Sequence, residues 1–310
     1  MKYKMINIIY DIITLLELII GVLIGIAFIT LGERKILGSM QRRQGPIKVG
    51  PKGILQSLAD GVKLIIKENI IPLESNKKMY ILAPILSLII ALTLWLNIPL
   101  KKGIIYIDEP LNILLIYAIT SLGIYSVIYS GWASNSKYGY IGSIRSISQL
   151  LSYEISIGLI IMNIICINNS FNLNKLIEYQ IYISNIFILF PIFLLYLISI
   201  LAETLRSPFD IVESESELVA GNLIEYAGMT FALMYLAEYS NIIFLSCLGS
   251  YLFFGNYLFS FTSFFIMFCF IWIRGSLPRL RWDHLLLLGW TKILPFTIGY
   301  IFFIISIFSF

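Results

Sequence analysis

Long apolar stretches alternate with short polar segments along this chain. A helix of about 20 apolar residues crosses a hydrocarbon core of about 30 Å. Because lipid offers no hydrogen bonds to the backbone, a crossing segment satisfies its own backbone groups as a helix. The pattern predicts an all-α polytopic membrane protein, with residues 1–310 as a single integral membrane domain and eight crossing helices. These helices are expected at residues 6–31, 79–98, 111–132, 152–168, 183–203, 218–245, 257–273 and 290–309.

The longest polar segment, residues 32–78, contains a helix of a different kind. Two Gly-Pro pairs end any helix that leaves the first crossing. After them, residues 53–71 carry apolar side chains at helical spacing and polar side chains mostly on the other face. The apolar members are Ile54, Leu58, Val62 and Ile65. An amphipathic lateral helix of this type lies in the membrane interface. It is either a plain surface helix or the floor of a lipid-accessible cavity.

Composition and charge agree with a membrane protein and give its orientation. Apolar residues make up 58% of the chain and charged residues 13%, whereas soluble domains carry roughly 25% charged residues. Four loops, at 32–78, 133–151, 204–217 and 274–292, hold 17 of the 22 Lys and Arg residues. The positive-inside rule places these loops on the cytoplasmic or matrix side and both termini opposite. The cations are scattered over the loops, which argues against nucleic acid as a partner.

Several kinds of site are disfavoured by what the sequence lacks. The three cysteines lie in or beside apolar segments, there is no CxxC pair, and His284 is the single histidine. This composition predicts no metal or iron–sulfur centre in the chain. Without a GxGxxG or GxxxxGK[ST] string, a nucleotide site is not expected either. The first apolar stretch lacks a small-residue cleavage site and is interpreted as a retained helix.

Acidic residues gather where an apolar chain can least tolerate them. Residues 202–226 hold six of the eighteen acids and a single Arg206. Carboxylates at membrane depth usually face the protein interior or a wet cavity and mark a proton or ion path. We therefore interpret four acids on three crossing helices as a proton relay, with an individual structural role for each as the alternative. They are Glu154, Glu203, Glu225 and Glu238, the last about 20 Å beyond Glu225 along one continuous helix.

Three ion-pair arrangements are expected near these acids. Glu203 and Arg206, three residues apart on the last turn of a helix, are placed to pair. Glu33 and Arg34 are interpreted as a boundary pair where the first crossing ends. The basic loop 274–292 is expected to dock beside the acidic stretch and neutralise it, unless its arginines act as topology signals alone. The acids concerned are Asp210, Glu213 and Glu215, and the arginines are Arg274, Arg279 and Arg281.

Five sets of residues, in order along the chain, carry a resemblance to a known family. They are ERKILGSMQRRQGP with VGPKGILQSLAD, GWASNSKY with the SYE ending at Glu154, AETLRSPFD with ESELVAGNLIEY, AEYSNII, and PRLRWD. Together they resemble the subunit 1 (H-type) membrane chain of respiratory complex I, the proton-pumping NADH:ubiquinone oxidoreductase. The resemblance covers essentially the whole chain.

This resemblance implies a subunit without a redox centre or a covalently bound cofactor, with ubiquinone as substrate. Flavin and iron–sulfur clusters would lie on partner subunits, and the lateral helix would frame the opening of a quinone tunnel. Residues that match tunnel positions are Arg34, Asp60, Phe209, Arg274, Arg279 and Arg281. The acidic loop at the inner end of the tunnel matches Asp210, Glu213 and Glu215. The proton path matches Glu154, Glu203, Arg206, Glu225 and Glu238.

The partners implied are the quinone-site subunits of the peripheral arm, small and antiporter-like membrane subunits, and lipids. Three positions depart from the family pattern: Leu205 replaces the usual Asn beside Arg206, and Trp282 and His284 stand where Tyr and Gln are usual. The expected location is the mitochondrial inner membrane, with a bacterial plasma membrane as the alternative. Competing functions are an equivalent subunit of a related proton-pumping hydrogenase or dehydrogenase, a stand-alone cation transporter, and a structural anchor. The anchor leaves the buried acids unexplained.

Overall fold

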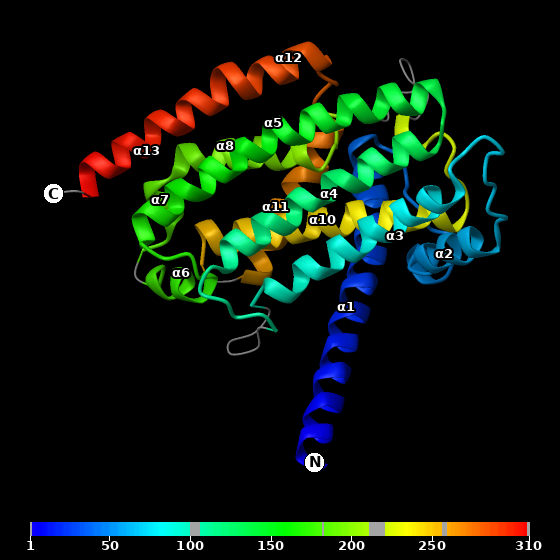
Figure 1. Cartoon of the computed structure of the whole chain (residues 1–310), viewed down its shortest axis with the longest axis horizontal. Helices are drawn as coiled ribbons and strands as arrows, with labels where there is room; N and C mark the ends of the chain where they lie inside the picture. Colours follow the sequence, from blue (N-terminus) through cyan, green and yellow to red (C-terminus); the bar gives the residue numbers. More distant parts are fainter. Residues whose placement is uncertain (1, 100–105, 182, 211–220, 256–258, 309–310) are drawn as a thin grey trace.

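The structure, a computed structural model, describes residues 2–99, 106–181, 183–210, 221–255 and 259–308, and every regular element in these ranges is helical (Figure 1). In chain order the elements are α1 (Lys2–Met40), η1 (Pro51–Gly53), α2 (Gln56–Ile66), α3 (Lys77–Leu94), η2 (Trp95–Asn97), α4 (Asn112–Ala133), α5 (Lys137–Asn168), α6 (Leu173–Tyr179), α7 (Asn185–Ile188), α8 (Phe190–Glu203), η3 (Gly221–Leu223), α10 (Met229–Phe253), α11 (Phe259–Ser276), α12 (Trp282–Leu287), η4 (Leu288–Ile293) and α13 (Leu294–Phe308).

The prediction of an all-α polytopic membrane protein is confirmed. Within the described ranges, seven helical segments are long and apolar enough to cross a membrane. An eighth apolar helix, α8, has 14 residues and follows α7 after one intervening residue. Together α7 and α8 occupy the region of the fifth predicted crossing, so each of the eight predicted crossings corresponds to apolar helix.

The loop predicted at residues 133–151 is wrong, because α5 begins at Lys137. Ser136 caps this helix by accepting a hydrogen bond from the backbone N–H of Gly139 at 3.2 Å. The first half of α5 is rich in small polar residues, which lowers its mean hydropathy, but Ser146 and Gln149 are fully buried. A serine that bonds to a carbonyl of its own helix tolerates burial, so the apolar-window criterion underestimated the length of this helix.

Three other predicted boundaries are also corrected. The lateral helix is shorter than residues 53–71: α2 spans Gln56–Ile66, and none of its residues is buried. The sixth crossing starts at Met229, because Gly228 has a φ of 62° and Asn69 Oδ1 accepts the N–H of Met229 at 2.8 Å. The basic loop shrinks to residues 277–281, since α11 and α12 extend into it.

The helices pack into one bundle that α1 crosses steeply (Figure 1). α3 packs on α4 and α10, and α5 packs on α4, α8 and α13. Aromatic side chains fill the centre: Tyr196 is fully buried, its hydroxyl donates to Leu245 O at 3.1 Å, and its ring abuts Gly249. The N-terminal half of α1 extends beyond the other helices (Figure 1). This packing places α8 beside α5 and α10 beside α3.

Candidate functional site

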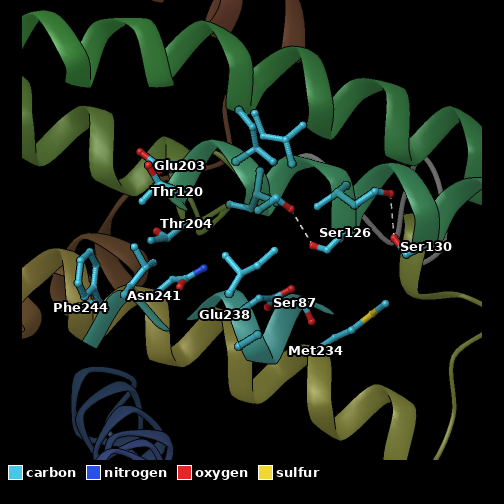
Figure 2. Close-up of a pocket in the computed structure, with 18 of the residues that line it drawn as sticks. Ser87, Thr120, Ser126, Ser130, Glu203, Thr204, Met234, Glu238, Asn241 and Phe244 are labelled. Carbon is cyan, nitrogen blue, oxygen red and sulfur yellow. Dashed lines mark hydrogen bonds between the residues drawn. The ribbon is translucent and has the colours of Figure 1, made fainter. Parts of the chain in front are cut away.

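A cavity of about 130 Å³ lies between α3, α4, α5, α8, η3 and α10 (Figure 2). Three of the predicted relay carboxylates line it: Glu154 from α5, Glu203 from α8 and Glu238 from α10. Figure 2 shows Glu238 and Asn241 projecting from α10 into the cavity and Glu203 on its opposite side. The fold thus brings together acids that lie up to 84 residues apart, as the positions 154 and 238 show.

The fourth predicted relay residue, Glu225, is placed differently. It lies between η3 and α10, so the expected continuous helix from Glu225 to Glu238 is wrong. Its backbone oxygen accepts a hydrogen bond from the Tyr80 hydroxyl at 2.5 Å. The rings of Tyr80 and Tyr226 stack 4.2 Å apart and fix this segment against α3. Burial and the neighbouring Tyr80 raise the pKa of Tyr226, so its phenol stays protonated.

Arg206 joins the cavity to a second polar cluster. Its Nη2 lies 3.5 Å from Glu238 Oε2, and its guanidinium stacks 4.5 Å from the centroid of the Tyr239 ring. The expected pair between Arg206 and Glu203 is wrong. Because α8 ends at Glu203 and Leu205 has a φ of 52°, the two side chains no longer share a helix face.

The second cluster is built around Glu33, which is 7% exposed. Its carboxylate pairs with Arg274 and accepts a hydrogen bond from the Tyr239 hydroxyl at 2.6 Å. A small cavity of about 20 Å³ adjoins these groups, and Thr204 lines both this cavity and the larger one. Glu33, Tyr239, Arg206 and Glu238 therefore form a continuous series of polar contacts that ends at the larger cavity.

Sequence reasoning missed the role of Glu33 and Tyr239 in this series. Glu33 was assigned to a boundary pair with Arg34, but adjacent residues on a helix point to different sides. Arg34 instead binds Asp60 on α2, with Nη1 and Oδ2 2.5 Å apart, and Gln56 Nε2 donates to Asp60 Oδ1 at 2.9 Å. The one signal in the sequence was that Glu33 and Arg34 are adjacent on a helix and must therefore point toward different partners.

The six predicted tunnel residues fall into separate pairings. Arg34 binds Asp60, Arg274 binds Glu33, and Arg281 Nε lies 3.0 Å from the exposed Asp283. Phe209 is buried, with its ring centroid 6.3 Å from that of Tyr153.

The expected docking of the basic loop beside the acidic stretch is confirmed at one pair. Arg279 Nη2 lies 3.7 Å from the buried Asp210, and the N–H of Leu280 donates to Pro208 O at 2.9 Å. Glu213 and Glu215 lie outside the described residues. Of the departing residues, Leu205 lines the larger cavity, Trp282 Nε1 donates to Ser148 Oγ at 3.3 Å, and His284 is exposed.

Among the residues that the structure describes, no group of three or more His, Cys, Asp or Glu side chains is placed to hold a metal ion. Three carboxylates, from α5, α8 and α10, line the larger cavity. Carboxylates and hydroxyls that line a cavity large enough for water suit proton transfer, in which each group holds a proton in turn.

The fold and this site define a multi-pass, all-helical membrane protein with a carboxylate-lined internal cavity. The chain belongs to the NADH dehydrogenase family, whose model matches residues 13–305. It is 46% identical to NADH-ubiquinone oxidoreductase chain 1 of Chondrus crispus, over 95% of each chain. It is 43% identical to the H-type subunit of the NADH-quinone oxidoreductase of Rhodospirillum centenum, over 93% of this chain and 90% of that one. The resemblance found in the sequence is confirmed.

Proposed function

We propose that this chain is the membrane subunit of proton-pumping NADH:ubiquinone oxidoreductase that frames the quinone tunnel and couples quinone reduction to proton translocation. Its family and its relatives support the broader assignment, a subunit of an NADH-quinone oxidoreductase in an inner membrane. Ubiquinone is the proposed substrate. Flavin and iron–sulfur clusters then belong to the subunits of the peripheral arm, which bind beside the loops that carry most of the cations.

Two observations support a tunnel beside α1 and α2. The exposed apolar residues of α2, Leu58 at 63% and Ile65 at 66%, suit a helix that lies in the lipid interface. On its other side, Asp60 and Gln56 tie α2 to Arg34 of α1. A hydrophobic quinone would pass between lipid and protein at this junction, toward Phe209, Arg274, Arg279 and Arg281. Glu213 and Glu215 are proposed, with Asp210, as the acidic loop at the inner end.

The proposed coupling depends on the series of polar contacts from Glu33 to Glu238. When quinone reduction places negative charge near Arg274, that cation is drawn away from Glu33, and the contacts through Tyr239 and Arg206 readjust. Two unit charges about 4 Å apart interact by roughly 4 kcal/mol at an effective dielectric constant near 20. A weaker hold of Arg206 on Glu238 then favours proton uptake by that carboxylate, and the larger cavity passes the proton to Glu203 and Glu154.

Glutamine variants of the cavity acids test this function in the intact complex. In sealed vesicles, we expect Glu203→Gln and Glu238→Gln each to lower the number of protons translocated per NADH oxidised, because glutamine cannot carry the proton. The matched control is Glu178→Gln, which changes an exposed acid on α6. Normal translocation in both cavity variants would refute the relay. A purified complex that lacks flavin and does not oxidise NADH would instead favour a related hydrogenase.

A further inference from the structure

The hydroxyl groups in the wall of the larger cavity do not offer their protons to it. A serine or threonine has one O–H to donate. Five of them donate it within their own helix or turn, at 2.7 to 3.0 Å, and Figure 2 draws two of these bonds. They are Ser87 to Pro84 O, Thr120 to Tyr117 O, Ser126 to Gly123 O, Ser130 to Val127 O, and Thr204 to Ile200 O. These groups therefore face the cavity as hydrogen-bond acceptors.

Two asparagines in the same wall provide hydrogen-bond donors. Asn222 of η3 and Asn241 of α10 both line the cavity, and the Oδ1 atom of each is buried without a hydrogen bond. Of the described side chains in this wall, theirs are the ones that carry N–H groups. An asparagine amide has two N–H donors and one acceptor oxygen, and neither amide forms a hydrogen bond to another described residue.

Among the residues that the structure describes, the cavity wall thus has many acceptors and few donors. Ionised carboxylates accept hydrogen bonds and do not donate them. An ionised carboxylate in a buried site is stabilised by donors, and it is costly without them. A cavity of about 130 Å³ has room for several waters, each of which needs two to four polar partners. Of the described side chains in this wall, the two amides are the ones whose N–H groups can donate a hydrogen bond to the oxygen of such a water.

We propose that Asn241 is a positioning residue of the proton path, whose amide holds a cavity water beside Glu238 and favours the ionised carboxylate. Asn241 follows Glu238 by three residues on α10, so the two side chains share a helix face. A proton that leaves Glu238 passes to this water, and the water releases another proton toward Glu203, with no electron transferred. Asn222 provides a second donor from η3. This inference rests on the proposed function of the carboxylates.

The test compares two variants in the intact complex in sealed vesicles. Asn241→Leu removes both donors at similar volume, whereas Asn241→Gln keeps the amide. We expect Asn241→Leu to lower the rate of proton translocation about tenfold and to lower the number of protons translocated per NADH oxidised, because the water between Glu238 and Glu203 loses its amide donor. Asn241→Gln should stay within about twofold of the unmodified complex in both measurements. If Asn241→Leu does not assemble, Asn241→Asp keeps the shape without the NH₂ group.

The matched control is Asn163→Leu, on α5. Asn163 is fully buried and its amide donates to Leu159 O at 2.9 Å and Thr297 O at 3.4 Å, away from the larger cavity. Asn163→Leu should reduce stability and leave the number of protons translocated per NADH oxidised unchanged. An unchanged rate and proton ratio in Asn241→Leu would overturn the inference while the Glu203→Gln and Glu238→Gln losses uphold the coupling function. Normal translocation in those two glutamine variants would overturn both.

Discussion

At the scale of single residues, Glu33 joins the first crossing helix to two other helices of the bundle. Its carboxylate is shared between Arg274 of α11 and the hydroxyl of Tyr239 of α10. A double-mutant cycle measures this link. We expect Glu33→Gln alone to destabilise the assembled complex by about 1–3 kcal/mol, because it leaves Arg274 half-buried without its carboxylate. Adding Arg274→Gln should recover part of that loss, since the unpaired cation is then gone.

Thermal unfolding of the purified complex provides the measurement, and Glu109→Gln, at an exposed acid, is the control. Losses that simply add in the double variant would contradict a coupled pair. Recovery of stability without recovery of proton translocation would assign Glu33 a part in the coupling series as well as in packing.

At the scale of elements, the contact between α5 and η3 sets one wall of the larger cavity. Gly142 faces the backbone of Gly221, and a Cβ at Gly142 would lie 2.7 Å from Gly221 Cα. We expect Gly142→Ala to push η3 away from α5, at a cost of about 1–3 kcal/mol from overpacking, and to lower proton translocation by displacing Asn222. Thermal unfolding and the ratio of protons to NADH would report these two effects.

The matched control is Gly61→Ala on α2, which adds the same methyl group without a clash, because nothing lies within 4 Å of the new Cβ. There, Gly61→Ala should stabilise the helix by roughly 0.5–1 kcal/mol through helix propensity alone. A loss of stability in Gly142→Ala together with a gain of stability in Gly61→Ala would support the packing argument. A stabilising Gly142→Ala would show that η3 adapts without cost.

The helices also show which parts of the structure could be predicted from the sequence. Among the described residues, apolar length predicted the seven helical segments that are long enough to cross a membrane, because hydrocarbon thickness imposes that length, whereas the fifth predicted crossing is divided between α7 and α8. The same criterion failed for the first half of α5, where Ser146 and Gln149 are buried against neighbouring helices. It also failed at Glu225, because the break before α10 depends on Asn69, 160 residues earlier. The pair of Glu33 and Tyr239 joins residues 206 positions apart, and no local pattern contains such a contact.

At the scale of the whole molecule, the distribution of charge predicts a fixed orientation in the membrane. Residues 32–78, 133–151, 204–217 and 274–292 hold 17 of the 22 Lys and Arg residues. α6, with Lys175, lies at the end of the bundle away from α2 and α12 (Figure 1). The positive-inside rule then places Lys175 on the side opposite the matrix or cytoplasm. Under the proposed function, this orientation also puts the peripheral arm and the tunnel on the same side.

Labelling of Lys175→Cys with a membrane-impermeant maleimide checks this orientation in the intact complex. Because Lys175 is exposed on the helix surface, we expect rapid labelling in right-side-out vesicles and at least tenfold slower labelling in inverted ones. The unmodified chain controls for Cys166, Cys247 and Cys269, which are buried or half-buried. Preferential labelling in inverted vesicles would reverse the topology. Quinone reduction would then occur on the face that the charge pattern assigns to the opposite compartment, and the direction proposed for proton uptake at Glu238 would reverse with it.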